Sequence, residues 1–305
     1  MEFRSGVPFR KCKILLTAFM DSFSSTESYL NLLLSLPNLE PYTVLSVFLL
    51  TVARILPILT IAPFMGAKNL PMTLRMMFSL ALVAVFLPQN LLVVHREIPY
   101  DLIWIGLMLK ELAIGTTLGI LITFPFFIVQ MSGSLIDHSR GSSALQVNDP
   151  TTQSQTGPIG ILFNYVLIAL FFSLDGPFLF FNGLAESYTL VPVDQVLNPA
   201  LFSPAAPFWK QVSTILEIGF NLSVQLAAPA LIGILLTDLF LGIANRLAPQ
   251  VQIVFLGISL KSWVGIALLT AAWGLIIQVM GKESIAWTQA VNKFIQQVGQ
   301  TYTPH

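Results

Sequence analysis

Charged residues interrupt the most apolar stretches of this sequence, and they are the first candidates for chemistry. In "LLTDLFLGIANRLAPQV", residues 235–251, Asp238 and Arg246 stand eight positions apart. On an α-helix that spacing is a rise of about 12 Å and a rotation of about 80°, so the two side chains share a side of the helix without touching. Each of them must therefore find a partner elsewhere.

Other apolar stretches also contain charged residues, namely Arg54, the adjacent pair Lys110 and Glu111, and Lys261. A charge at the centre of a bilayer costs about 2.5–3.5 kcal/mol on insertion scales. Arg54, Asp238 and Lys261 would together cost roughly 8–10 kcal/mol if each faced lipid alone, which is comparable to the net stability of a whole domain. We therefore expect these charges either to be paired or to line water.

Two kinds of role fit such charges. The structural one is a set of ion pairs between helices, for example Arg54 with Asp238. The functional one is a polar conduit or a proton relay. A relay needs titratable groups at short intervals, and Glu111, Glu217 and Asp238 are the candidates within the apolar segments. The relay is the weaker of the functional options.

The sequence lacks the patterns of an enzyme or a metal protein. It contains no G-x-S-x-G, no H-E-x-x-H, no Walker loop and no cysteine–histidine pairing. Its single cysteine is Cys12, and the three histidines, His95, His138 and His305, have no metal-ligand spacing. We expect no catalysis, no metal and no cofactor.

The composition indicates a membrane protein. Of 305 residues, 55% are hydrophobic and only 10% are charged, and the mean hydropathy is +0.77. Soluble domains carry about 25% charged residues, so this chain cannot cover a globular surface with polar side chains. The net charge of zero leaves no basic excess to neutralise phosphates, which argues against nucleic acid as a partner.

Hydropathy predicts an all-α, polytopic membrane-type protein. We expect about six long helical segments, broken by prolines and packed within an assembly. The segments span residues 42–64, 76–94, 102–129, 159–181, 215–244 and 251–280, and their prolines are Pro57, Pro63, Pro88, Pro125, Pro177 and Pro229. Each proline removes a helical hydrogen bond, and in lipid a neighbour must satisfy the freed carbonyl. Burial among partner helices is therefore expected.

The third segment also contains a G-x-x-x-G motif. Gly115 and Gly119 would let another helix backbone approach closely. Ordinary packing within the chain is favoured over a contact with another subunit.

Three regions divide the chain. Residues 1–41 are expected to form an N-terminal extension, with translation starting at Met20 as an alternative for its first part. Residues 42–281 form the helical domain, with a long polar loop at 131–158. Residues 282–305 form an amphipathic helix and tail, in which Trp287, Val291, Phe294 and Val298 recur at helical spacing. We expect this helix to lie at an interface or against a partner.

Several separated motifs resemble one known family. Residues 48–88 combine an arginine in the first helix, Arg54, an "APF" exit at 62–64, Pro71 before the second helix, and Arg75. "MLKELAIGTTLG" (108–119), "NDPTTQSQTGPIG" (148–160) and "APALIGILLTDLFLGIANRLAPQVQIVFLGISLK" (228–261) follow in order. Over residues 43–281 the sequence resembles the FliR/SctT family of export-gate proteins of flagella and type III secretion injectisomes, and more closely the injectisome branch.

The resemblance implies an assembly in the bacterial inner membrane. One copy of such a protein joins several copies of SctR-like and SctS-like subunits in a helical cone around a secretion pore for unfolded polypeptides. An SctU-like switch protein and an SctV-like export ring are further implied partners. Enclosure of its helices by sister subunits would explain the prolines and the charges.

The resemblance also implies that the loop after the third segment plugs the closed pore. The plug and gating candidates are Phe124, Phe126, Phe127, Met131, Asp137, His138, Arg140, Asp149, Pro150, Thr151 and Thr152. For most of the phenylalanines, helix packing is the favoured alternative. The candidates for buried charges that support assembly are Arg54, Arg75, Lys110, Glu111, Asp238, Arg246 and Lys261.

The function predicted from the sequence is therefore an export-gate subunit that helps form and close a secretion pore. Two alternatives remain. One is a secondary transporter with a substrate site at the membrane midplane, built around Arg54 and Asp238. The other is a scaffold that nucleates assembly and never touches the secreted chain.

Overall fold

We describe the protein from a computed structural model, over residues 41–65, 71–94, 98, 101–141, 147–148, 155–195, 207–247 and 253–300. The expected N-terminal extension, apart from Pro41, lies outside these residues. The elements, in chain order, are α3 (Pro41–Ile61), the 3₁₀ helix η1 (Pro63–Met65), α4 (Met72–Val93), α5 (Leu102–Ser139), β1 (Val147–Asn148), β2 (Gln155–Thr156), α6 (Pro158–Ser173), α7 (Gly176–Leu190), α8 (Pro207–Leu247), α9 (Ile253–Ala271) and α10 (Trp273–Gln300).

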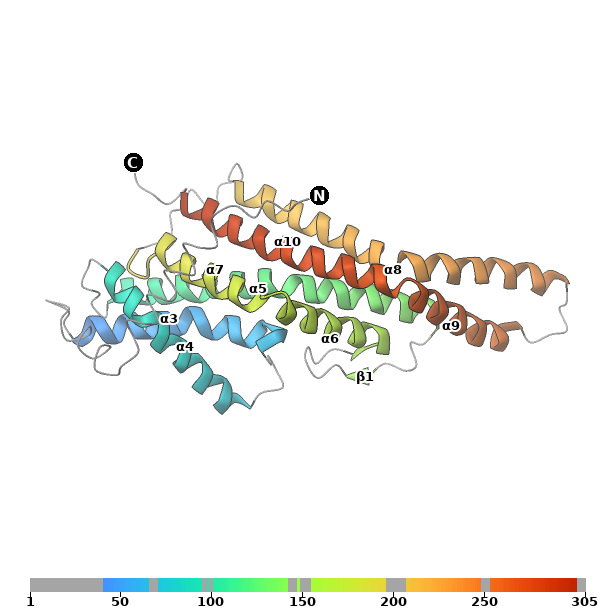
Figure 1. Ribbon diagram of the computed structural model, residues 1–305. Helices are drawn as coiled ribbons and strands as arrows, with labels where there is room; N and C mark the ends of the chain where they lie inside the picture. Colours follow the sequence, from blue (N-terminus) through green and yellow to red (C-terminus); the bar gives the residue numbers. More distant parts are fainter. Residues whose placement is uncertain are drawn as a thin grey trace.

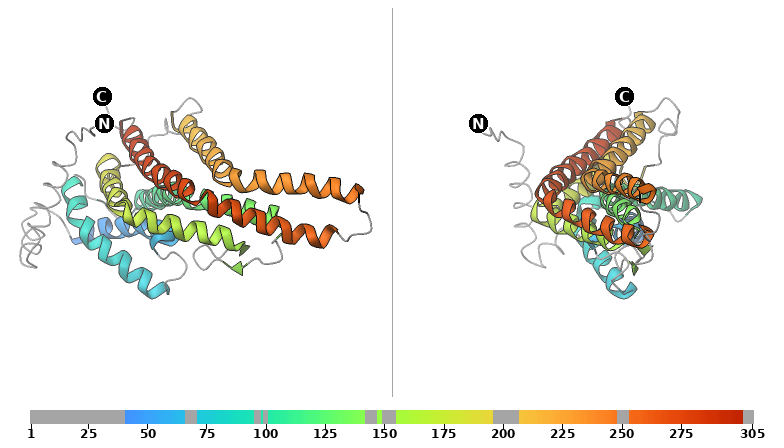
Figure 2. Two further views of the ribbon diagram at one scale, coloured as in Figure 1. Left: turned by 45° about the vertical axis from the view of Figure 1, so that its right-hand side comes forward. Right: turned by 90° about the vertical axis from the view of Figure 1, so that its right-hand side faces the viewer.

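The helices form an elongated bundle around α5 (Figure 1). Helices α3, α6 and α8 each pack against α5, and α7 packs against α10. Helices α3 and α4 lie at one end of the bundle, while α9 and the second half of α8 extend together from the other end (Figures 1 and 2). The prediction of an all-α protein is confirmed, with one short strand pair added between α5 and α6.

The third predicted segment, residues 102–129, is shorter than the helix that it corresponds to, α5. Helix α5 continues ten residues beyond Val129, to Ser139, so residues 131–139 are helical and the predicted loop is shorter. Ser132, Gly133 and Ser134 are weak helix formers, but Gly133 packs against the backbone of Gly160 in α6 and the helix continues. The helix ends where Gly141 adopts a positive φ of 79°, a conformation that glycine reaches without steric cost.

Most of the prolines do not interrupt their helices. Pro57, Pro88, Pro125 and Pro229 lie inside α3, α4, α5 and α8, which continue on both sides. The expected breaks at these positions are therefore wrong. A helix can continue through a proline when other groups satisfy the freed carbonyl. Helix α8, which contains Pro229, changes direction part-way along its length (Figure 2).

One break lies beside an expected proline, because α7 begins next to Pro177, whereas the break between α9 and α10 has no proline near it. The fourth segment is the pair α6 and α7, bent by 74°, and the sixth is the pair α9 and α10, bent by 62°. At the first bend Asp175 has a left-handed backbone with φ of 57°. Four described helices are long and apolar enough to cross a membrane, or up to six spans if each bent pair counts as one. The prediction of about six membrane segments agrees with the second count.

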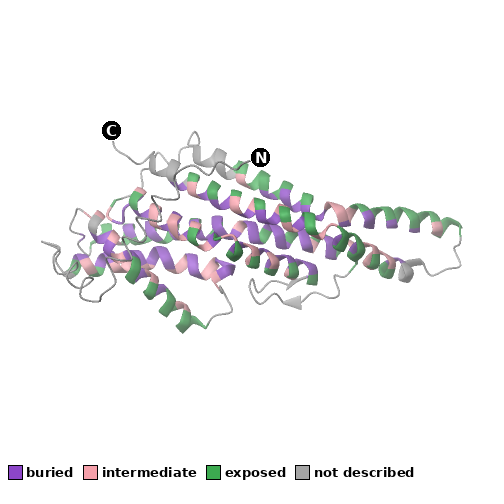
Figure 3. Cartoon of the chain, in the orientation of Figure 1, coloured by how far each residue is buried: buried purple, intermediate pink, exposed green. Residues whose placement is uncertain are grey.

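Burial is uneven along the molecule (Figure 3). Stacked and edge-on rings of Phe64, Phe126, Phe171 and Phe180 fill the core where η1, α5, α6 and α7 meet. By contrast, only 22% of the apolar window of α4 is buried, against 56% in α3. Large apolar side chains are also exposed along the second half of α8, namely Leu235, Leu236, Leu239, Phe240, Ile243 and Leu247. Surfaces of this kind require lipid or further subunits to cover them.

Candidate functional site

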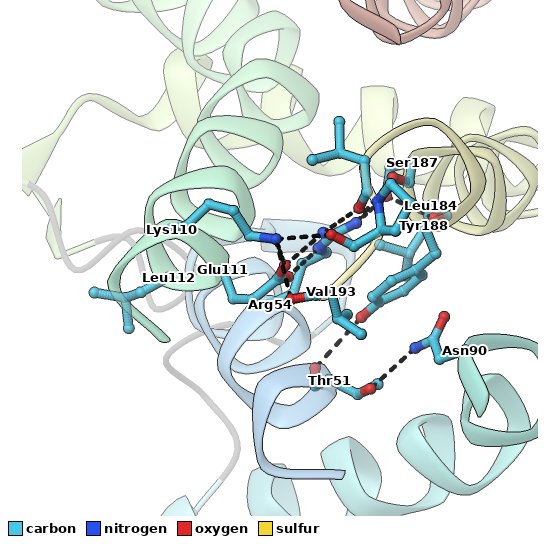
Figure 4. Close-up of polar contacts among 12 residues, drawn as sticks. Thr51, Arg54, Asn90, Lys110, Glu111, Leu112, Leu184, Ser187, Tyr188 and Val193 are labelled. Carbon is cyan, nitrogen blue, oxygen red and sulfur yellow. Dashed lines mark hydrogen bonds and ion pairs between the residues drawn. The ribbon is translucent and has the colours of Figure 1, made fainter. Parts of the chain in front are cut away.

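A fully buried ion pair joins α3 to α5 (Figure 4). The Nε of Arg54 donates to one carboxylate oxygen of Glu111, and Nη2 donates to the other at 2.8 Å. Nη1 and Nη2 of Arg54 also donate to the carbonyl oxygens of Ser187, at 2.9 Å, and Val191, at 2.8 Å. The predicted ion pair between Arg54 and Asp238 is therefore wrong, because Arg54 pairs with Glu111 and Asp238 pairs with Lys261.

Lys110 adds a second cation to this cluster. Its Nζ lies 2.7 Å from the carboxylate of Glu111. It also donates to the carbonyl oxygens of Pro192 at 2.8 Å, Val193 at 3.3 Å and Gln195 at 2.9 Å. These carbonyls follow the C-terminus of α7, where the partial negative charge of the helix end favours a cation. One carboxylate and a row of carbonyl oxygens thus compensate two buried positive charges.

An aromatic ring and a glycine hold Arg54 in position. The guanidinium carbon lies 4.2 Å from the ring centroid of Tyr188, a cation–π geometry. A methyl group at Gly115 would overlap the carbonyl oxygen of Arg54, and one at Gly119 would lie 3.2 Å from the Cα of Ile58. The G-x-x-x-G motif therefore brings α5 against α3 within the same chain. Each guanidinium nitrogen of Arg54 thus has an acceptor within the chain.

A second buried pair lies at the C-terminal end of α5. Asp137 and Arg140 are 4% and 7% exposed, and the Nη2 of Arg140 donates to Oδ1 of Asp137 at 2.5 Å. Both residues were predicted to belong to a plug loop. They lie on the last turn of α5 and at its C-cap, packed into the molecule.

The third ion pair connects α8 and α9. Lys261 contacts Asp238, and their side chains are 24% and 45% exposed. The partner that Asp238 requires is thus a lysine of the next helix. Arg246 is exposed in the last turn of α8, where a cation is favoured by the helix dipole.

The other candidates are spread over the molecule. Phe126 is buried in the aromatic core, Phe124 stacks on Trp287 with ring centroids 5.2 Å apart, and Phe127 is 44% exposed. Met131 and His138 are exposed on α5, and Arg75 is partly buried on α4. Asp149, Pro150, Thr151 and Thr152 lie outside the described residues. On either side of them, β1 and β2 pair antiparallel.

Most of the chain matches a known protein family. Residues 45–285 match the family described as bacterial export proteins, family 1. The chain belongs to this family.

Relatives of this export protein come from injectisomes and from flagella. It is 30% identical to the secretion system apparatus protein SsaT of Salmonella typhimurium over 213 residues, which covers 70% of this chain and 79% of SsaT. It is 34% identical to the Yop proteins translocation protein T of Yersinia pestis over 167 residues, 52% of this chain and 60% of that protein. It is 29% identical to the flagellar biosynthetic protein FliR of Bacillus subtilis over 234 residues, 76% of this chain and 88% of FliR.

Some contacts of this export protein were not predicted. Sequence reasoning treated Asp137 as a loop residue, although its Oδ2 accepts hydrogen bonds from the start of α6. It also missed the donation from Trp287 to the carbonyl of Leu121. A signal for the second contact exists, because Pro125 leaves that carbonyl without its usual helical donor.

Proposed function

We propose that this export protein forms part of the wall of the type III secretion pore, and that the segment between α5 and α6 closes the pore. The chain is a multi-pass inner-membrane protein and a subunit of the type III export gate. Passage of unfolded polypeptides requires no reaction by the subunit itself. Its contribution is steric.

The exposed apolar helices carry the proposal for the wall. The second half of α8 exposes Leu235, Leu239 and Phe240 at 63–65% of their surface, and α4 is mostly uncovered. The charges of the cluster at Arg54, by contrast, are satisfied within the chain. A chain with its polar groups satisfied inside and its apolar helices uncovered is suited to enclosure by sister subunits. We propose SctR-like and SctS-like subunits, an SctU-like switch protein and an SctV-like ring as its partners.

The strand pair supports the proposal for closure. β1 and β2 pair in the register Val147 with Thr156 and Asn148 with Gln155, beside the N-terminal end of α6 (Figure 1). The pairing of β1 with β2 restricts the backbone conformations of the segment between α5 and α6. A restricted segment loses less conformational entropy than an open loop when it occupies a pore. This favours a defined plug at residues 141–157.

The partners are tested by purifying the tagged chain in mild detergent, followed by native mass spectrometry. A large complex with two smaller, multi-copy hydrophobic subunits is expected. A monomer or a homodimer would contradict the wall proposal and favour the transporter. That alternative is already weakened, because Arg54 and Asp238, its suggested site, have separate partners.

Closure is tested by shortening the hairpin. Replacing residues 149–154 by Asn-Gly preserves the register of β1 and β2, since this dipeptide favours two-residue hairpin turns. We expect assembled complexes that leak ions and small molecules. A control variant carries six Gly and Ser residues at 149–154 and retains the length. An assembled, shortened variant with unchanged permeability would contradict the plug role. Crosslinking of a stalled substrate to residues 131–158 would separate this role from a scaffold, which gives no adduct.

A further inference from the structure

One carboxylate holds both ends of the segment between α5 and α6. At the first end, Oδ1 of Asp137 accepts a hydrogen bond from Nη2 of Arg140 at 2.5 Å. At the second end, Oδ2 of Asp137 accepts from the backbone N–H groups of Ile159, at 2.9 Å, and Gly160, at 3.3 Å. Because Asp137 is buried, water does not compete strongly for these bonds. The exit from α5 and the entry to α6 are therefore fastened at a single point.

Helix α6 depends on this carboxylate for its N-terminal cap. Its own N-cap residue is Gly157, which has no side chain to accept a hydrogen bond, and Pro158 follows at the first helical position. A methyl group at Gly157 would overlap the carboxylate of Asp137. Gly157 therefore leaves the space that allows a residue from α5 to cap α6.

Arg140 extends the same contact to α9. Its Nη1 donates to the hydroxyl of Ser262 at 3.2 Å, while Nη2 serves Asp137. Helix α9 approaches closely at this point, since a methyl group at Gly265 would lie 2.8 Å from the Cδ of Arg140. The planar guanidinium thus bridges two partners with two different nitrogens in fixed directions, whereas a lysine would have to serve both partners from one ammonium nitrogen.

We propose that Asp137 and Arg140 are positioning residues that couple the base of the β1–β2 segment to α9. This inference rests on the proposed role of that segment in closing the pore. Helices α8 and α9 extend from the end of the bundle and expose apolar surface, so neighbouring subunits determine where they lie. A displacement of α9 moves Ser262 and with it the guanidinium of Arg140. The movement of Arg140 then disturbs the carboxylate of Asp137, which caps α6. With α9 in place, the base is held and the pore stays closed.

The test compares closed-state ion leak per assembled complex among single variants. Ser262→Ala removes the contact with α9 and leaves the pair of Asp137 and Arg140. Arg140→Lys retains a cation for Asp137 but loses the separate nitrogen that donates to Ser262, so its leak should match that of Ser262→Ala. Loss of a hydrogen bond to a charged group shifts the closed–open equilibrium by roughly tenfold, and we expect a rise in leak of that order. Asp137→Asn, which loses the ion pair, should leak at least as much.

Ser139→Ala is the matched control, because the Ser139 hydroxyl bonds only to the carbonyl of Leu135 in its own helix among the described contacts. It should leave the leak unchanged. The double variant Arg140→Gln with Ser262→Ala should leak no more than Arg140→Gln alone. Both substitutions remove the same hydrogen bond, the one between Arg140 and Ser262, so their effects should not add. Additive leaks would overturn the coupling.

Two outcomes separate the coupling from the plug. If the variant with Asn-Gly at 149–154 leaks while Ser262→Ala and Asp137→Asn behave as Ser139→Ala, the plug stands and the coupling is wrong. If the shortened variant does not leak, both proposals fall. Reduced complex yield from Asp137→Asn without any leak per complex would show a role in folding only, and would also overturn the coupling.

Discussion

The indole Nε1 of Trp287 donates a hydrogen bond to the carbonyl oxygen of Leu121, at 2.9 Å. That carbonyl lies four residues before Pro125, which has no N–H to offer it. The C-terminal helix α10 therefore repairs the hydrogen bond that Pro125 removes from α5. This explains how α5 runs for 38 residues through a proline in an apolar setting.

The same contact corrects the expectation for the C-terminal segment. Residues 282–305 were predicted to form a separate amphipathic helix and tail against a partner or an interface. The described part of this region, up to Gln300, continues α10 from Trp273 across the expected boundary at residue 281, and Trp287 and Val291 are buried against this chain. Trp287 and Val291, two members of the predicted apolar stripe, thus pack against the chain's own helices.

Trp287→Phe is expected to destabilise the protein by about 1–3 kcal/mol, because the carbonyl of Leu121 is left buried without a donor. The substituted ring can still stack on Phe124. Thermal unfolding in detergent measures the loss. Trp263→Phe is the control, since Trp263 is 76% exposed. Equal unfolding temperatures for the two variants would show that the hydrogen bond does not matter.

Glu111→Gln is expected to destabilise the protein by about 3–5 kcal/mol, since it leaves Arg54 and Lys110 buried without a carboxylate. The yield of folded protein and the unfolding temperature report this loss. Glu217→Gln, an exposed position on α8, should be neutral. A Glu111→Gln protein as stable as the Glu217→Gln control would argue against a structural ion pair and reopen a functional role for the charge.

Gly115→Ala is expected to force α3 and α5 apart, because the new methyl group would overlap the backbone of Arg54. Overpacking of this kind costs about 1–3 kcal/mol. Gly106→Ala in the same helix, where a methyl group would meet nothing within 4 Å, should have no such cost. Unfolding temperatures compare them. The prediction fails if both substitutions are tolerated equally.

Asp238→Leu is expected to reduce the yield of the assembled complex, because Lys261 would remain without its partner on an apolar surface. The exchange Asp238→Lys with Lys261→Asp keeps the pair and should restore much of the yield. Native mass spectrometry of the purified complexes measures both. Normal assembly of Asp238→Leu with altered conductance would instead assign the pair to gating.

Local sequence was sufficient to predict the membrane class, the all-α fold class and the positions of the charges within apolar segments. Hydropathy depends on the residues themselves, and long apolar stretches in lipid must become helices because the backbone has no water to bond. The same reasoning identified Arg54, Lys110, Glu111 and Asp238 as groups that need partners. It also identified Gly115 and Gly119 as points of close approach between helices.

The partners themselves follow from how the helices pack. Arg54 pairs with Glu111, which is 57 positions away in the sequence, and Asp137 caps a helix that begins 21 residues later. Neither contact can be predicted from the spacing of neighbouring residues. The end of α5 could not be predicted because residues 131–139 are mostly weak helix formers, and packing against α6, as at Gly133 and Gly160, keeps them helical. The bend after Ser173 lies beside Asp175 and Pro177, which the sequence marks, but the bend after Ala271 interrupts a stretch of unbroken apolarity. Hydropathy states that a group is costly in lipid, but the three-dimensional arrangement alone determines which neighbour removes that cost.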